Sequence, residues 1–459
     1  MNKYIKLIRN IGIFTIGNLG SKFLTFLIVP LYTYVLTTEE YGLVDTTITL
    51  VSLFLPFFTC AIYEAILRYT LNSKYSKEDV FTNCFVVLIL GFLIFILLMP
   101  IINLLIDFNF LLYFIFLLIA QGIYTFFQQF SKGIDRNQVY TISGLIYTFI
   151  MLVLNVLFLV NFKMGIPGYF LSMIIGYTIS SIYITITTNI FKYFKVHVIS
   201  KESIKVYLRY SIPLVPNSIM WWVMNASSKF FILYFLDLSA NGIYAIAFKI
   251  PTVISMFSQI FFQAWQISAV EEENSTSKST YYSKIYNLFS IVMFGISSFL
   301  LVVLKPLILN FFSQDYVDAW EYIPFLILAV VFSSFSSFIG VNYIVSKKTS
   351  GVFTSSLIGA IANCVFNILL IPYIGLYGAA IATLLSYFIM WLIRYRDTKK
   401  QINIQMNKFV YLFNTLTITF QIILLYIPSS NSMIFILFLF IILAIIDFYQ
   451  IYSSFVNAR

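Results

Sequence analysis

Long apolar runs separated by short polar segments recur from one end of the chain to the other. An α-helix needs about 20 apolar residues to cross the hydrocarbon core of a bilayer, and the runs are of that length. We therefore predict an all-α polytopic membrane protein with fourteen transmembrane helices. The predicted spans lie near residues 11–36, 45–67, 81–105, 110–131, 138–160, 167–191, 210–236, 242–269, 286–312, 322–345, 351–371, 375–394, 408–427 and 432–453.

Basic residues divide unevenly between the segments that join these runs. If both chain ends are cytoplasmic, only Lys163 and Lys305 of the 28 lysines and arginines fall in loops on the opposite side. This is the distribution that the positive-inside rule expects. We predict cytoplasmic N- and C-termini. The formal net charge of +10 then reflects topology, and no nucleic-acid partner is expected.

The composition limits the kinds of functional site that the protein can contain. Hydrophobic residues make up 60% of the chain and charged residues 10%, against about 25% charged residues in soluble domains. The one histidine, His197, lies in a polar loop, and the three cysteines lie in apolar runs without metal-binding spacing. We therefore expect no catalytic residues, no metal site and no enzyme activity.

The two halves of the chain resemble each other. NLGSKF in the first run and NASSKF in the seventh place Asn, Ser, Lys and Phe at the same internal spacing. Internal repeats of this kind are typical of transporter folds, and they predict two parallel six-helix lobes. The predicted domains are 1–200 (first lobe and a basic linker), 201–400 (second lobe) and 401–459 (two further helices). Later matches follow in the same order and pair Asn155 with Asn367, Gly165 with Gly375, Gly168 with Gly378, and Tyr177 with Tyr387.

Lysines and amides inside the apolar runs form polar faces. Lys22 lies about eleven residues from either end of its run, too far for its ammonium group to reach the headgroups except through a cavity. Polar neighbours at steps of three and four extend such faces, although polar side chains also bond helices to each other. A basic cavity suits an anion such as a diphosphate. We predict that the substrate cavity is lined by Asn18, Lys22, Thr25, Gln128, Asn225, Lys229, Lys249, Gln259 and Gln263.

Glu64 and Arg68 lie four residues apart near the inner end of the second run. One interpretation is an ion pair within a helix. The other is a cytoplasmic gate or a coupling site for Na⁺ or H⁺, because Glu64 is the one acid deep within a run. Apart from such a coupling ion, we expect no cofactor.

Several stretches resemble a known family. GSKFLTFLIVPLYTYVLTTEEYGLVDTTITLVSLFLPFFTCAIYEAILRY is similar to the start of the polysaccharide (O-antigen and capsule) flippases, with LTTEEYG after the first helix and EAILRY closing the second. GLYGAAIATLLSY resembles the glycine hairpin late in their second lobe. These proteins belong to the multidrug/oligosaccharidyl-lipid/polysaccharide exporter superfamily. The resemblance implies a MATE-like, V-shaped pair of lobes that opens a central cavity to each side of the membrane in turn.

The resemblance also implies a function. We expect a multi-pass flippase of the bacterial cytoplasmic membrane that moves undecaprenyl-diphosphate-linked oligosaccharide to the outer leaflet. Its partners would be that polyprenyl-diphosphate-linked oligosaccharide, membrane lipids, and a polysaccharide polymerase with its chain-length regulator. The alternatives are an ion-coupled multidrug or small-metabolite antiporter, which the scarcity of deep acids argues against, and a lipid II flippase of the same superfamily.

Overall fold

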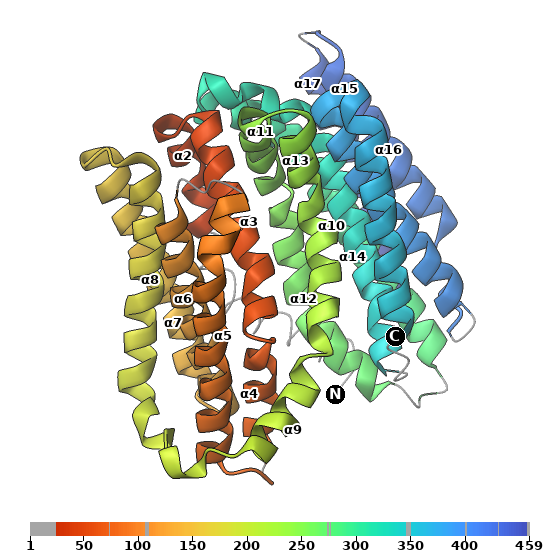
Figure 1. Cartoon of the computed structure of the whole chain (residues 1–459). Coiled ribbons are helices and arrows are strands. Elements are labelled where there is room, and N and C mark those ends of the chain that lie inside the picture. Colours follow the sequence, from red (N-terminus) through yellow and green to blue (C-terminus); the bar gives the residue numbers. More distant parts are fainter. Residues whose placement is uncertain are drawn as a thin grey trace. The chain divides into compact units, whose positions relative to one another are not determined.

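The computed structural model describes residues 24–72, 74–105, 110–272, 275, 277–345, 350–399, 402–429 and 431–456. Over these residues the regular secondary structure is helical throughout (Figure 1). They form two compact units, and the boundary between them along the chain falls within the helix Leu214–Phe235. We name them the N-unit, which ends at Ala226, and the C-unit, which begins at Ser227. The predicted domain boundaries at residues 200 and 400 stay a prediction.

The helices follow one another with short connections. The N-unit contains α2 (Val29–Val35), α3 (Thr38–Phe58), α4 (Ile62–Thr70), α5 (Lys77–Leu105), α6 (Leu111–Gly133), α7 (Asn137–Asn155), the π-helical turn η1 (Val156–Asn161), α8 (Gly165–Thr188), the 3₁₀ turns η2 (Ile190–Tyr193) and η3 (Val196–Val198), α9 (Lys201–Ser211) and the first part of α10 (Leu214–Phe235). The C-unit contains the rest of α10, α11 (Leu238–Lys249), α12 (Thr252–Glu271), α13 (Lys278–Phe311), the 3₁₀ segment η4 (Gln314–Glu321), α14 (Ile323–Val345), α15 (Ser350–Thr398), α16 (Lys408–Tyr426) and α17 (Ser432–Val456).

Many of these helices can cross a membrane. Among the described residues ten are long and apolar enough, or eleven if α11 and α12, which meet at 45°, count as one bent span. The predicted all-α, multi-pass membrane fold is confirmed. The count of fourteen and the cytoplasmic termini stay predictions, since residues 1–23 lie outside the described part and α15 combines two predicted spans.

The two predicted spans within α15 are separated by a tight turn. The backbone breaks at Ile374 and Gly375, and Gly375 has φ +56°, a conformation that favours glycine. A Cβ atom on Gly378 would lie 2.6 Å from the carbonyl carbon of Leu370. Residues eight apart along a straight helix are separated by about 12 Å. The chain therefore turns back here, and α15 is a helical hairpin whose two arms touch at Gly378.

The N-unit has the same turn at the aligned position. Gly165, which begins α8, has φ +58°, and it shares this positive φ only with Gly375 among the described glycines. A Cβ atom on Gly168 would lie 3.0 Å from Cβ of Phe158 on the preceding segment. Aligned glycines thus occupy matching places in two hairpins, as a duplicated lobe requires.

The aligned asparagines also have the same burial and the same hydrogen bond. Asn155 and Asn367 are both fully buried. Each donates its side-chain amide to the backbone carbonyl four residues earlier, at 2.8 Å. The local structure at these positions therefore supports the internal repeat.

The predicted span near residues 45–67 is broken in the structure. α3 ends at Phe58 and α4 begins at Ile62, and between them Cys60 and Ala61 have φ +51° and +48°. Gly91 of α5 packs on the break, where a Cβ atom would lie 2.2 Å from the carbonyl oxygen of Phe58. α4, which carries Glu64 and Arg68, is therefore a short separate helix rather than the end of α3.

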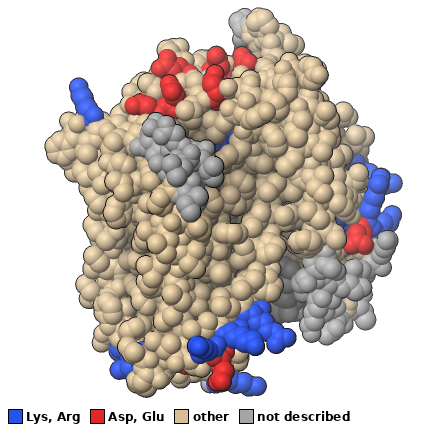
Figure 2. Space-filling model, viewed as in Figure 1, with Lys and Arg blue, Asp and Glu red and all other residues tan. Residues whose placement is uncertain are grey.

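The basic linker after α8 is attached to the start of α5. Asn83 donates from Nδ2 to the carbonyl of Val198 at 3.1 Å and accepts from the N–H of Ser200 at 2.9 Å. Asp79 accepts hydrogen bonds from the hydroxyls of Ser203 and Tyr207. Burial, and then Asp79, raise the pKa of Tyr207, so its phenol keeps the proton that it donates. Basic side chains gather at the end of the N-unit where α9 lies (Figure 2).

Tyr207→Phe is expected to loosen α9 from α5. A hydrogen bond to a charged group contributes about 1.5–3 kcal/mol, so amide exchange in α9 should become about tenfold faster or more. Hydrogen exchange followed by mass spectrometry of residues 195–210 measures this. Tyr210→Phe is the matched control because the Tyr210 ring is 37% exposed. Equal effects of the two variants would contradict the role of the Asp79 contact.

Candidate functional site

Part of the predicted cavity lies outside the described residues. This applies to Asn18 and Lys22, which fall within residues 1–23, and to the side chain of Gln263. Thr25 is the first predicted cavity residue that the structure places, and its side chain is exposed. The roles assigned to these four residues stay predictions.

A buried polar cluster anchors the second part of α10 in the C-unit. Ser227 donates its hydroxyl to Oδ1 of Asn363 at 2.6 Å, and Asn367 donates from Nδ2 to the hydroxyl of Ser228 at 3.1 Å. The hydroxyls of Ser228 and Thr383 lie 3.2 Å apart in a hydrogen bond. Asn363 and Asn367 lie on the first arm of the α15 hairpin and Thr383 on the second. The cluster therefore fixes this second part of α10 against both arms.

This anchoring decides where the predicted cavity residues of α10 point. Ser227 and Ser228 face the interior of the C-unit, and Asn225 and Lys229, four residues apart, share another face of the helix. Asn225 is exposed and Lys229 is partly exposed. Lys229 is thus presented next to a rigid anchor, at the position in the repeat that corresponds to Lys22.

The C-unit also presents a polar face on α12. Lys249, at the end of α11, is partly exposed and Gln259 is exposed. On the opposite side of α12, Ile254, Ile260 and Trp265 are buried. Lys249 and Gln259 therefore point away from the core of the C-unit, whereas Ser258 of α12 is buried and hydrogen-bonds to Ser334. A cavity role for Lys249 and Gln259 stays a prediction.

Gln128 has a different environment. Its Nε2 donates to the hydroxyl of Tyr124 at 2.7 Å and to the carbonyl of Tyr140 at 3.3 Å. Tyr124 lies on α6 with Gln128, and the bond to Tyr140 joins α6 to α7. Bonding between helices, the alternative interpretation of this stripe, thus accounts for the amide in this structure, and a cavity role for Gln128 stays a prediction.

Glu64 and Arg68 are both exposed on α4. Glu64 interacts electrostatically with Lys132 of α6, a helix that packs against α4. Within the described part of the chain the structure gives no ion pair between Glu64 and Arg68. A gate or coupling role for these two residues stays a prediction.

Sequence reasoning missed most of the cluster around Ser228. Asn363 and Thr383 were not among the predicted residues, nor was Tyr244 of α11, whose hydroxyl lies 3.1 Å from that of Thr383. One signal was present, since Asn363 and Asn367 stand four residues apart in an apolar run, and polar residues in such runs are often functional. The described residues contain no group of three or more His, Cys, Asp and Glu side chains able to hold a metal ion.

Comparison with known proteins identifies a family whose model matches the chain. The model of a family described as polysaccharide biosynthesis protein matches residues 7–266. An uncharacterised membrane protein of Methanocaldococcus jannaschii is 32% identical over 165 residues, which are 35% of this chain and 32% of that protein. The chain therefore spans about a third of the length of this curated relative.

Solved structures share the fold. The lipid II flippase MurJ in an inward closed conformation has a TM-score of 0.74 at 15% identity, covering 97% of this chain and 99% of that one. An outward-facing multidrug resistance MATE family transporter of the MOP superfamily has a TM-score of 0.60 at 14% identity, covering 90% and 96%. The predicted MATE-like fold is confirmed.

Proposed function

Because the chain belongs to the polysaccharide biosynthesis protein family, we propose that it is a flippase for a lipid-linked oligosaccharide. It would move an undecaprenyl-diphosphate-linked repeat unit of a surface polysaccharide from the inner to the outer leaflet of the bacterial cytoplasmic membrane. The family match, which covers more than half of the chain, is the observation that carries this proposal. The fold shared with a lipid II flippase supports it, because that protein is also a flippase of a lipid.

The chemistry of the substrate fits the predicted cavity residues. A diphosphate carries concentrated negative charge, and a lysine about 4 Å away attracts a single charge by about 4 kcal/mol at an effective dielectric constant of 20. Lys229 would supply such a charge from the part of α10 that is fixed in the C-unit, and Lys249 is a second lysine of the same unit. Asn225 and Gln259 offer amides that both donate to and accept from sugar hydroxyls. No bond is made or broken, so the protein acts as a transporter and not as an enzyme.

The energy source is a further part of the proposal. Glu64 beside Lys132 is the candidate coupling site, because a carboxylate that gains or loses Na⁺ or H⁺ changes its attraction to the neighbouring cation. The translocated oligosaccharide would then pass to a polymerase and its chain-length regulator.

A lipid II flippase is the second candidate, favoured by the TM-score of 0.74 to MurJ. Deletion of the gene distinguishes the two candidates. If the cells lose a surface polysaccharide but continue to grow, the result favours the oligosaccharide flippase, because a lipid II flippase supplies the cell wall itself.

Lys229→Ala is expected to reduce surface polysaccharide at least tenfold in a deletion strain complemented with the variant. The loss of one lysine–diphosphate attraction is the physical reason. Lys229→Arg should restore part of the polymer because it keeps the charge. The measurement is polysaccharide by gel and immunoblot, normalised to membrane-inserted protein.

Lys163→Ala is the matched control, since it removes an exposed lysine far from α10 in the sequence. Normal polymer with Lys229→Ala at normal protein level would remove Lys229 from the substrate path. Drug resistance on overexpression without any polysaccharide defect on deletion would favour the multidrug antiporter instead.

A further inference from the structure

The basic linker between α8 and α10 presents a row of exposed cations. Lys201, Lys205 and Arg209 of α9 stand four residues apart, are all exposed and therefore share one face of the helix. Lys195, in the segment before α9, is exposed as well. Figure 2 shows basic side chains gathered at this end of the N-unit. The linker thus offers a positively charged surface to whatever lies against it.

Carboxylates do not neutralise this surface. Glu202 is the one acid of the linker, and no carboxylate in the described part of the chain forms an ion pair with the four cations. Asp79 of α5 accepts hydrogen bonds from the hydroxyls of Ser203 and Tyr207. Tyr207 stands two residues after Lys205, about 200° around the helix. Asp79 therefore holds the opposite side of α9 and leaves the cations directed away from α5.

Large apolar side chains of the same linker are exposed too. Phe191, Val196 and Ile199 are 71%, 68% and 44% exposed. Val206 and Tyr210, four residues apart on α9, form an exposed apolar strip beside the row of cations. A helix with cations on one side and apolar side chains on the next is typical of segments that lie in the interface of a bilayer.

Hydrogen bonds hold the linker beside the first turns of α5. The hydroxyl of Thr82 donates to the carbonyl of Tyr193 at 3.1 Å and accepts from the N–H of Lys195 at 2.9 Å. Asn83, which bonds the chain just before α9, lies only about 9 Å along the helix from Lys77, the first residue of α5. α5 is long and apolar enough to span a membrane. The linker is therefore fixed at the level where this span ends.

We propose that the linker binds the anionic surface of the bilayer leaflet at this end of the N-unit. The cations of α9 and Lys195 would lie among the headgroup phosphates. Phe191, Val196 and Ile199 would lie deeper, where the headgroups meet the acyl chains. A lipid surface fits better than a soluble partner, because it complements the charge and meets the linker where a span ends. The inference does not depend on what the protein transports.

Fluorescence quenching of the full chain in lipid nanodiscs tests this. His197 of η3 is exposed, so His197→Cys, in a background without the three native cysteines, carries an environment-sensitive dye. Spin-labelled phosphatidylglycerol and phosphatidylcholine with the same acyl chains act as quenchers. We expect stronger quenching by phosphatidylglycerol, and Lys205→Gln should lower this preference about fivefold, the size of one lysine–surface attraction. Val196→Ser should reduce quenching by both lipids equally, because it removes an apolar contact and no charge.

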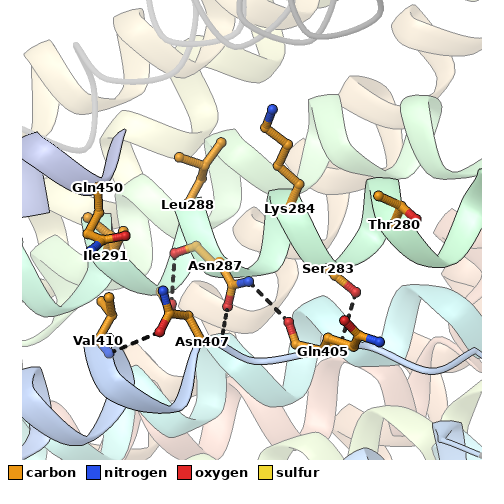
Figure 3. A pocket seen from close by; sticks show the side chains of 11 residues that line it. Thr280, Ser283, Lys284, Asn287, Leu288, Ile291, Gln405, Asn407, Val410 and Gln450 are labelled. Carbon is orange, nitrogen blue, oxygen red and sulfur yellow. Dashed lines mark hydrogen bonds between the residues drawn. The ribbon is translucent and has the colours of Figure 1, made fainter. Parts of the chain in front are cut away.

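Lys284→Gln is the matched control. Lys284 belongs to the C-unit, where it lines a polar pocket between α13 and the segment before α16 (Figure 3). Its replacement removes the same charge from outside the linker. Equal loss of preference in both lysine variants would mean a general charge effect and would overturn the proposal. So would equal quenching by the two lipids with the linker unaltered, no quenching by either lipid, or loss of the preference on adding inorganic phosphate at constant ionic strength.

Discussion

Gly378→Val is expected to leave little folded protein in the membrane. The Cβ atom would lie 2.6 Å from the carbonyl carbon and 2.7 Å from the carbonyl oxygen of Leu370. Both are backbone atoms of the other arm of the α15 hairpin, so no side-chain rotation relieves the contact. The two arms would have to separate. The hydrogen bonds of Ser228 on α10 to Thr383 on one arm and to Asn367 on the other would then be lost. Fluorescence-detected size-exclusion chromatography of detergent extracts measures the folded fraction.

Two further glycine variants separate steric contact from backbone strain. Gly375→Ala places a side chain where φ is +56° but where no atom lies within 4 Å, so it should lower stability by only about 1–2 kcal/mol. Gly295→Ala meets neither obstacle and should be neutral or slightly stabilising, because alanine is the better helix former. If Gly378→Val were no worse than Gly375→Ala, the close approach of the two arms would be wrong.

The hairpins show what sequence reasoning could reach. Twenty-residue apolar runs predict helices because a bilayer leaves the backbone few other ways to satisfy its hydrogen bonds. The repeated glycines could be aligned because a positive φ and a close approach both exclude a side chain, and this requirement is local. The sequence therefore pairs Gly165 with Gly375 correctly, and they are the two described glycines with positive φ.

The side-chain contacts could not be predicted in the same way. Ser228 bonds to Thr383 and Asn367, which are 155 and 139 positions away. Nothing local in an apolar helix tells which of its faces meets a partner so far along the chain. For the same reason the sequence could not decide the role of Gln128. Its polar stripe fits a cavity wall and a helix contact equally well until the position of α7 is known. The break at Cys60 and Ala61 also escaped detection because neither residue type favours a positive φ.

Arg394 is the clearest case of a residue that hydropathy alone misplaces. At the predicted cytoplasmic end of its span it counts as a headgroup cation, but its side chain is 1% exposed. Nε donates to Ser355 and Nη2 to Ser356, both at 2.9 Å, and Nη1 donates to the carbonyl of Ser336 at 3.0 Å. One guanidinium group thus joins α14 and both arms of α15.

Arg394→Ala is expected to lower the stability of the C-unit by about 2–5 kcal/mol, the range for large buried side chains replaced by alanine. The relief of a buried charge opposes this loss, since desolvation of an ion costs several kcal/mol. Arg394→Met separates the two effects because it restores most of the volume without the charge. Arg394→Lys keeps the charge but one nitrogen cannot serve Ser355 and Ser356 together. We expect the midpoint temperatures to rank arginine above methionine and lysine, and alanine lowest.

A substitution at Gly340 of α14 tests whether the Arg394 guanidinium group lies where α14 meets the two arms of α15. A Cβ atom on Gly340 would lie 2.8 Å from Nη1 of Arg394. Gly340→Ala should therefore destabilise the wild-type protein by about 1–3 kcal/mol, as overpacking does. In the Arg394→Ala background the same change meets an empty space and should be neutral or stabilising. The double-mutant cycle then gives a coupling of at least about 1 kcal/mol between the two positions. Additive effects would mean that the guanidinium group does not hold the three helix segments together at this point.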